Sequence, residues 1–394
     1  MKLKQNWMQI KTKDKFMEDS NTFLSNKLKI VHIHSNHAFV SSSSCFENEK
    51  FQNEFIYLGK EINYNGLYAS SLSYYSYSPN DLNKVIQICN KSDIVVLYNL
   101  DFAKSYISNR LDKEVMIFWR FFGEELYSRL TKIVLSNSTL ENLKFKTSTK
   151  EQLIKLVDIL RFKTTKYHEF EKSLDRINYF LGLAIDEYYY LDNYFDNLPE
   201  FIQLPYLLNQ GELQPFTSKK NRVIVGNNRS PYNNHLDIIN IISRHSTISD
   251  IEFLLLFNYG QENDYTEKVL QESKNIGNLK ILYDYLPFSD FQKMYEDVGA
   301  LVINSYRQMA MANIFTAIRS GVKVYLNSKN EIYHWLVKEE FFVFSIEEFE
   351  IDLSKSELTL TKNQVTHNIK QIETLKQKYN VVNFHETISQ LKQM

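Results

Sequence analysis

Short runs of apolar residues, each about as long as a buried strand, recur along the second half of this chain from Arg222 onward. They alternate with segments whose apolar residues have helical spacing. We therefore expect strands at five ranges: 223–225, 251–257, 279–283, 300–304 and 323–326. Strands that alternate with helices of this length are typical of a parallel α/β sheet with helices on both faces.

Helix signals lie between these expected strands. The apolar positions between 235 and 242 fall at i, i+3, i+4 and i+7, which is one face of a helix. Pro231 suits the first turn of this helix, and Ser230 is its candidate cap. Further helices are expected from 288 onward, at 309–320 and after 346.

The first half of the chain shows the same alternation less regularly, with expected strands at 28–33, 94–98, 115–119 and 177–181. A polar stretch near residues 209–211 separates the halves, and 394 residues exceed one typical core. We predict an α/β chain with two Rossmann-like domains facing a cleft. Its expected parts are a basic N-terminal extension (1–28), an α/β domain (29–212), a second α/β domain (213–345) and C-terminal helices (346–394).

Composition excludes several classes of protein. The net charge of −1 gives no general attraction to nucleic acid. The ten glycines are scattered, so neither a dinucleotide-binding G-x-G-x-x-G nor a phosphate-binding Walker loop can form. G-x-S-x-G, H-E-x-x-H, C-x-x-C and a convincing D-x-D metal site are missing, and we expect no metal or other cofactor. Without a signal peptide or membrane span in the sequence, we expect a cytoplasmic location.

Polar residues follow the expected strands of the second half. Since the carboxyl ends of parallel strands share one edge, these residues should gather there. Arginines and backbone N–H groups suit the diphosphate of a sugar nucleotide, and amides suit its hydroxyls. The other interpretation is that loop ends are polar in any protein. The candidate donor-binding residues are Gly226, Asn227, Asn228, Arg229, Tyr283, Asp284, Arg307, Gln308 and Asn313.

Several segments, in order, resemble one family. The block "LKILYDYLPFSDFQKMYEDVGALVINSYRQMAMANIFTAIRSGVKVYLN" is similar to glycosyltransferase family 56, with Arg307, Gln308 and Gly321 on matching positions. "VIVGNNRSPYNNHL" and "FWRFFGEELY" resemble further segments of that family. Its members are N-acetylfucosaminyltransferases that act on a lipid-linked acceptor in enterobacterial common antigen synthesis. The resemblance covers most of residues 29–345.

The resemblance implies a GT-B glycosyltransferase fold. It also implies a nucleotide-sugar donor in the second domain, TDP-linked in this family, and an acceptor in the first. The transfer would invert the anomeric carbon without a required metal. The chain departs from the family at His37 and Glu125, where the family has Asp, and at Phe122, where it has Trp. Ala310 and Ala312 replace family glycines.

An inverting transfer needs a base that takes the proton of the acceptor hydroxyl. "VHIHSNHAF" offers His34 and His37, and "FFGEELY" offers Glu124 and Glu125. We carry His37 and Glu125 forward as the two candidates. A loop histidine is often only a hydrogen-bonding residue, and Glu125 could instead cap a helix or bind sugar hydroxyls.

Two basic segments suggest contact with a membrane surface. Residues 144–172 contain eight basic and four acidic side chains, with apolar residues on one helical face. The first fifteen residues have a similar pattern. The other interpretation is a solvated helix packed on the protein.

The leading hypothesis is a glycosyltransferase that moves a deoxy-amino sugar, similar to N-acetylfucosamine, from a nucleotide to a lipid-linked saccharide. A nucleotide-sugar epimerase of the same fold and a non-catalytic sugar-nucleotide-binding assembly protein remain as alternatives.

Overall fold

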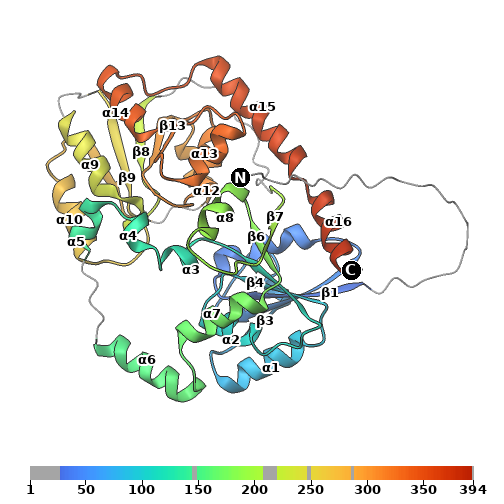
Figure 1. Cartoon of the computed structure of the whole chain (residues 1–394). Helices are drawn as coiled ribbons and strands as arrows, with labels where there is room; N and C mark the ends of the chain where they lie inside the picture. The colour runs from blue at the N-terminus through green and yellow to red at the C-terminus, as the bar shows by residue number, and fades with distance from the viewer. Residues whose placement is uncertain (1–26, 144–148, 207–219, 246–249, 285–287, 393–394) are drawn as a thin grey trace, which may run out of the picture.

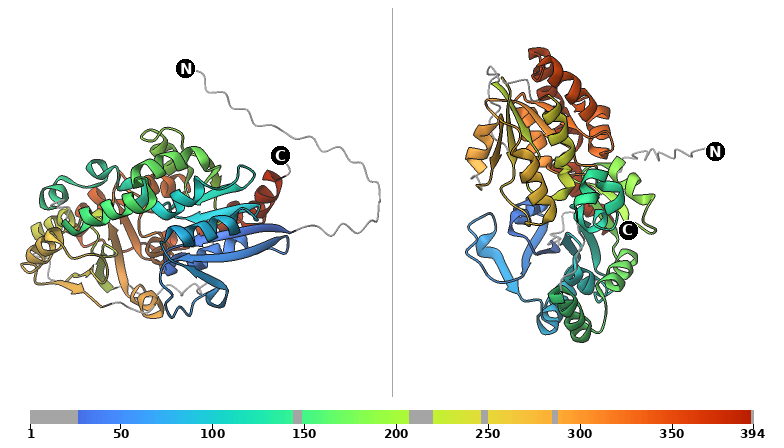
Figure 2. Two further views of the ribbon diagram at one scale, coloured as in Figure 1. Left: turned by 90° about the horizontal axis from the view of Figure 1, so that it is seen from below. Right: turned by 90° about the vertical axis from the view of Figure 1, so that its left-hand side faces the viewer.

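The computed structural model describes residues 27–143, 149–206, 220–245, 250–284 and 288–392. Two parallel sheets form two bodies, one above the other in Figure 1 and in the right-hand view of Figure 2. The first is seven-stranded, in the order β3-β2-β1-β4-β5-β6-β7. Its strands are β1 (Leu28–His34), β2 (Phe51–Leu58), β3 (Leu72–Tyr75), β4 (Ile94–Tyr98), β5 (Met116–Arg120), β6 (Tyr179–Gly182) and β7 (Glu200–Gln203).

The second sheet is six-stranded, in the order β10-β9-β8-β11-β12-β13. Its strands are β8 (Lys220–Val225), β9 (Glu252–Leu256), β10 (Leu279–Leu282), β11 (Val298–Ile303), β12 (Lys323–Leu326) and β13 (Phe344–Ser345). In both sheets the chain order reverses beside the first strand, between β1 and β4 and between β8 and β11. Loops at the carboxyl ends of such neighbouring strands diverge and leave a crevice, where ligands of α/β proteins bind.

Helices cover the faces of both sheets. In the first half they are α1 (Pro79–Cys89), α2 (Phe102–Ser108), α3 (Glu124–Tyr127), α4 (Thr131–Val134), α5 (Asn137–Asn142), α6 (Thr149–Phe162), α7 (Lys166–Arg176) and α8 (Ile185–Asp192), with 3-10 helices η1 (His37–Phe46) and η2 (Ala69–Ser71). The second half has η3 (Pro231–Asn233), α9 (His235–Arg244), α10 (Asp264–Ser273), α11 (Phe288–Met294), α12 (Met311–Arg319), α13 (Glu331–Lys338), α14 (Ile346–Lys355), α15 (Lys362–Lys378) and α16 (Val381–Leu391).

The central strands are buried on both faces, which explains why they read as continuous apolar runs. All five residues of β4 and all six of β11 are buried. Each expected strand of both halves is present, with ends shifted by up to three residues. The expectation of two α/β domains of parallel strands is therefore confirmed. β2, β3, β7 and β13 have no counterpart in the sequence prediction.

One helix start was predicted wrongly. Pro231 opens the separate 3-10 turn η3, and the Ser230 side chain makes no capping hydrogen bond there. Asn234 then adopts a left-handed conformation, with φ of 47°, and α9 begins at His235. A left-handed residue interrupts the helical path, so the turn and the helix cannot be continuous.

Two elements pack on the body to which they do not belong by sequence. α5, from the first half, contacts α9 and α10 of the second. α15 packs on α12, and α16 then returns to the first sheet, as the red ribbon in Figure 1 shows. Phe384 and Ile388 of α16 are buried against Ile30 and Phe46. The expected domain boundary near residues 209–211, and most of the N-terminal extension, lie outside the described residues.

In the part of the chain that the structure describes, none of the helices has the length and apolar character that crossing a bilayer requires.

Candidate active site between the two domains

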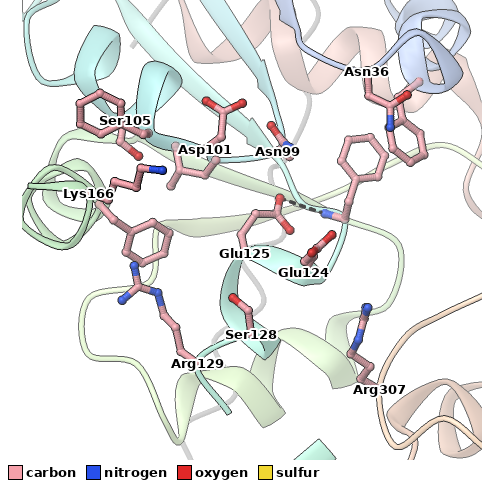
Figure 3. Close-up of a pocket in the computed structure, with 15 residues that line it drawn as sticks. Asn36, Asn99, Asp101, Ser105, Glu124, Glu125, Ser128, Arg129, Lys166 and Arg307 are labelled. Carbon is pink, nitrogen blue, oxygen red and sulfur yellow. Dashed lines mark hydrogen bonds between the residues drawn. The ribbon is translucent and has the colours of Figure 1, made fainter. Parts of the chain in front are cut away.

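A cavity of about 580 Å³ lies where the two sheets face each other (Figure 3). Its walls come from the carboxyl ends of three neighbouring strands of the first sheet: Asn36 follows β1, Asp101 follows β4 and Glu125 follows β5. Arg307, which follows β11, closes it from the second domain. The cavity therefore lies at the crevice that the reversal of strand order creates.

Glu125 is the carboxylate that the structure prepares most clearly for proton transfer. One oxygen, Oε1, accepts a hydrogen bond from the Trp119 ring nitrogen at 3.2 Å. It also accepts one from the Phe122 backbone N–H at 3.3 Å, drawn as the dashed line in Figure 3. The other, Oε2, is buried and has no partner among the described residues. Burial raises the pKa of Glu125, and the hydrogen bonds oppose that shift only in part. A held carboxylate with one unused oxygen and a raised pKa suits a general base.

Gly123 allows this arrangement. Its φ of 103° is one that side chains rarely adopt, and a Cβ there would lie 2.9 Å from the Arg307 guanidinium. The sequence resemblance singled out this glycine. Its physical role is to let the turn after β5 pass close to the second domain.

A buried ion pair forms the floor beside Glu125. The Lys104 ammonium is fully buried and donates to the Ser35 hydroxyl at 2.6 Å, to Asn99 Oδ1 at 2.6 Å and to Asp101 Oδ2 at 2.5 Å. Burial alone would raise the pKa of Asp101, but the charge and hydrogen bonds of Lys104 bring it below its ordinary value. Asp101 therefore stays ionised and paired, which leaves Glu125 as the better proton acceptor of the two.

Arg307 lies between two tyrosines. Its guanidinium carbon is 4.4 Å from the centroid of the Tyr232 ring and 5.7 Å from that of Tyr127. One terminal nitrogen donates to the Gln308 backbone carbonyl at 3.0 Å, and the buried Nε has no partner among the described residues. An arginine held by ring faces, rather than by a carboxylate, keeps its charge available to a phosphate.

Gln308 faces Glu187 of α8, so it joins the two domains. With its amide nitrogen directed at Glu187, Gln308 donates to the two carboxylate oxygens at 2.5 and 3.3 Å. The Tyr127 hydroxyl donates to the same carboxylate at 2.9 Å. Burial raises the pKa of Glu187 to about 8, against the opposing effects of Tyr127 and the Arg307 charge.

The turn after β8 is held mainly by its own contacts. Gly226 has a φ of 68°, and a Cβ there would lie 3.0 Å from the His235 ring. His235 is buried, and its Nε2 pairs with the Asn228 carbonyl at 2.9 Å. The Asn228 side chain accepts from the Ser230 N–H at 2.8 Å. Much of this turn's hydrogen-bonding capacity is therefore used to shape the turn.

Arg229 is also engaged. Its Nε donates to the Phe257 carbonyl at 3.0 Å, and a terminal nitrogen forms an ion pair with Glu262 at 2.6 Å. Asn227 differs, because its buried Oδ1 has no partner among the described residues. Asn227 is thus the side chain of this turn that has an acceptor free for a ligand.

The remaining donor candidates are spread out. β8 and β11 are neighbours, so the turn at Gly226 and the loop at Arg307 lie together. Tyr283 and Asp284 follow β10, the edge strand, and are exposed. Asn313 is half-buried in the first turn of α12.

The two histidine candidates lie outside the residues that line this cavity. His37 stacks on Tyr57 with ring centroids 3.8 Å apart, and its Nε2 is 3.4 Å from the Tyr74 hydroxyl. His34 is buried against Tyr98 and pairs with the Ser43 hydroxyl at 2.9 Å. Of the residues chosen from the sequence, the cavity brings together Glu125 and Arg307.

A second cavity of about 360 Å³ also lies between the domains. Ser41, Ser44 and Arg120 line it from the first domain, and Ala312 and Thr316 of α12 line it from the second. In the described part of the chain, no three His, Cys, Asp or Glu side chains come together as a metal site would need.

Comparison with solved structures decides the fold. The sucrose-phosphate synthase of Thermosynechococcus elongatus superposes with a TM-score of 0.62 at 10% identity, covering 93% of this chain and 99% of the other. The Anabaena protein HepE in complex with UDP-glucose gives 0.62 at 11%, covering 92% and 99%. A glycosyltransferase from Rickettsia africae gives 0.58 at 11%, covering 93% and 98%. The fold is GT-B.

No protein-family model matches the chain, and neither does any curated protein sequence. At identities this low the likeness concerns the GT-B fold alone.

Sequence reasoning missed the ion pair in the cavity floor and Glu187. Asn99 and Asp101 follow the buried strand β4. Ligands of α/β proteins bind where the strand order reverses, so these residues would have been candidates if the sequence had predicted β1 and β4 as neighbours. Lys104 carried no signal, because a lysine is rarely fully buried.

Proposed function

We propose that this chain is a nucleotide-sugar-dependent glycosyltransferase that transfers a sugar with inversion. The observation that carries the proposal is the cavity in which Glu125, from the first domain, and Arg307, from the second, line the same space. A GT-B fold brings an acceptor and a donor together between its domains. UDP-glucose in the HepE structure and the names of the other relatives support a sugar nucleotide as donor.

Glu125 is the proposed base. Its unpartnered Oε2 takes the proton of the acceptor hydroxyl while that oxygen attacks the anomeric carbon of the donor sugar. The bond from the anomeric carbon to the diphosphate oxygen breaks with inversion, and both electrons leave with the diphosphate. The raised pKa makes Glu125 a stronger base than an exposed carboxylate.

Arg307 is the proposed partner of the leaving diphosphate. Its guanidinium carries no carboxylate ion pair among the described residues, and its buried Nε is unpartnered. Positive charge already in place where negative charge develops stabilises the transition state without reorganisation. In this proposal Asn227 contacts the nucleoside or sugar through its free amide oxygen. Gly226, Asn228 and Arg229 shape that turn, and Tyr283, Asp284, Gln308 and Asn313 remain proposed donor contacts.

The finer proposal follows the family 56 resemblance. The donor is a TDP-linked deoxy-amino sugar similar to N-acetylfucosamine, the acceptor is a lipid-linked saccharide, and the protein works at the cytoplasmic face of a membrane. This finer proposal is supported by three segments that resemble the family in the same order along the chain. They contain Gly123, Gly226 and Arg307.

Nucleotide binding tests the proposal first. Thermal unfolding should be followed with UDP-, TDP- and GDP-sugars, and at least one should raise the melting temperature in proportion to the logarithm of its concentration. A melting temperature unaffected by all three would refute the glycosyltransferase and both alternatives.

Product analysis then separates the three functions. With the stabilising donor and a saccharide diphosphate-lipid acceptor, a transferase yields a longer lipid-linked saccharide. Release of an epimerised sugar nucleotide instead would establish the epimerase. Binding without any product with a panel of acceptors would favour the assembly protein.

A further inference from the structure

Helix α6 lies at the edge of the molecule, away from both sheets (Figure 1). Leu153, Leu156, Val157 and Leu160 fall at i, i+3, i+4 and i+7, so they share one face. Their exposed fractions are 60%, 57%, 58% and 79%. Four large apolar side chains together in water are unusual for a protein surface, and such a patch marks a contact with something else.

The same helix is attached to the protein by its opposite side. Phe162 is buried and packs edge-on against Phe102 and Tyr106, with ring centroids 4.9 and 5.3 Å apart. At 100° per residue, Phe162 lies about 160° around the helix from Leu160. Phe162 therefore anchors the last turn of α6 on the side opposite the exposed apolar face.

Positive charge flanks the apolar face. Arg161 and Lys163 are exposed, and the acidic Asp158 forms an ion pair with Lys166 at 3.9 Å. An apolar helix face bordered by lysine and arginine is complementary to the surface of an anionic bilayer, where acyl chains accept the leucines and head groups the cations. A second copy of the same basic helix would bring like charges together.

The position of α6 relates this face to the candidate active site. A small cavity of about 130 Å³ at the base of α6 is lined by Phe102, Ile159 and Lys166. Phe102 and Lys166 also line the cavity that holds Glu125. The cavity at the base of α6 and the candidate active site thus share the side chains of Phe102 and Lys166 in their walls.

We propose that the exposed face of α6 docks the protein on an anionic lipid bilayer, with the Glu125 cavity held beside the membrane surface. The apolar side chains enter the boundary between head groups and acyl chains, and the basic residues bind the anionic head groups. That the bilayer also delivers the acceptor rests on the proposed function. The membrane contact itself does not depend on it.

Flotation with lipid vesicles tests the docking. The full chain should float with vesicles of phosphatidylcholine mixed with phosphatidylglycerol, more weakly with pure phosphatidylcholine, and less as salt is added. The double variant Leu156→Ser, Leu160→Ser should lower the bound fraction about tenfold or more. The matched control Ile351→Ser, Val382→Ser removes two apolar residues of similar exposure (52% and 60%) on α14 and α16 and should float like the wild type.

Three results would overturn the proposal. Wild-type protein could fail to float with the anionic vesicles, or the α6 variant could float as well as the control. Sedimentation velocity could show an oligomer that the α6 variant alone dissociates, which would make the face a protein interface.

Nucleotide-sugar stabilisation, measured on the same variants, keeps this test separate from the proposed function. If the α6 variant no longer floats with vesicles but is still stabilised by the nucleotide sugar, the result supports the role of α6 in docking. Docking without any stabilisation rejects the proposed donor and leaves the membrane contact standing.

Discussion

The carboxyl edges of the two sheets have the same topology and different chemistry. The first edge holds charge: Asp101 and Glu125 line the cavity, and the fully buried Lys104 pairs with Asp101. The second edge is built of amides. Asn234 accepts from the Ser136 N–H at 2.8 Å and donates to the Asn304 carbonyl at 3.1 Å, and much of the remaining network has the same neutral character.

From this difference we infer that the two edges are suited to different tasks. Buried charges shift pKa values and can move protons, so the first edge suits the chemical step. Buried amides pair with backbone groups and stay uncharged at any pH. The second edge therefore suits the precise positioning of a ligand and of the residues at the contact between the domains. Two arginines are exceptions at the second edge: Arg229 pairs with Glu262, whereas Arg307 lines the cavity of the first edge.

The largest expected effect concerns the charged edge. Glu125→Gln keeps the size of the side chain and removes the base, so transfer should fall about 10²- to 10⁴-fold. Steady-state kinetics with an identified donor and acceptor measures the loss, and nucleotide binding should persist. Glu124→Gln, an exposed neighbour in the same cavity wall, is the matched control. Comparable loss in both variants would remove the special role of Glu125.

Arg307→Ala should lower transfer about 10²- to 10³-fold, because the leaving diphosphate loses a charge partner. Arg307→Lys retains the charge and should recover part of the activity. Melting temperature must be measured alongside, since Arg307 packs between two tyrosine rings. Full activity in the alanine variant would place the diphosphate elsewhere.

On the amide edge, Asn234→Ala should affect stability rather than chemistry. It leaves the buried Ser136 N–H and Asn304 carbonyl without this partner and puts alanine in a left-handed conformation. We expect the free energy of unfolding to fall by about 2–3 kcal/mol in denaturant titrations. Asn193→Ala, at an exposed position with only a local hydrogen bond, should change it by less than about 0.5 kcal/mol. Equal effects would contradict the structural role of the amide network.

Glu187 links the two edges and should make stability depend on pH. Its pKa is raised by burial from 4.5 to about 8, so the folded protein keeps a proton that the unfolded chain releases in that range. Stability from this group is full below about pH 4.5 and declines as pH rises toward about 8. Glu187→Gln removes that decline, so its melting temperature relative to wild type should increase with pH across this range. A difference that stays constant with pH would contradict the assigned shift.

The smallest effect is expected at Ala310, which precedes α12 with a φ of 58°. Glycine adopts this conformation without strain, so Ala310→Gly should raise the free energy of unfolding by about 0.5–1 kcal/mol. Ala312→Gly, inside the first turn of α12, should lower it by a similar amount. Calorimetry of the pair tests whether the two positions respond in opposite directions, as the left-handed conformation at 310 and the helical one at 312 require.

Sequence patterns were most informative where burial is complete. Strands β9, β11 and β12 and the central strands β4 and β5 are largely apolar and buried, because both of their faces are covered. β2 escaped notice because Gln52, Asn53 and Glu54 interrupt its apolar pattern near the edge of the sheet. β13 has only two residues, too few for any periodicity.

The candidate site was predictable only in part. Arg307 and Glu125 were found because each follows a strand or a recognisable segment. His37 looked similar by that criterion, yet its ring stacks on Tyr57 outside the cavity lining. The sequence shows which residues directly follow a strand. It does not show in which direction the loop carries them, because that depends on contacts with residues much later in the chain.

By itself, the sequence determined the class of the fold, the alternation of strands and helices and the apolar face of α6, because these follow from the periodicity of burial. Only the tertiary structure decided that Glu125 and Arg307 line one cavity, that the Lys104 paired with Asp101 is fully buried, and that the face of α6 stays exposed. Glu125 and Arg307 are far apart in the chain. Lys104 and Asp101 are close in sequence, but their burial and pKa values depend on neighbours that no local pattern specifies.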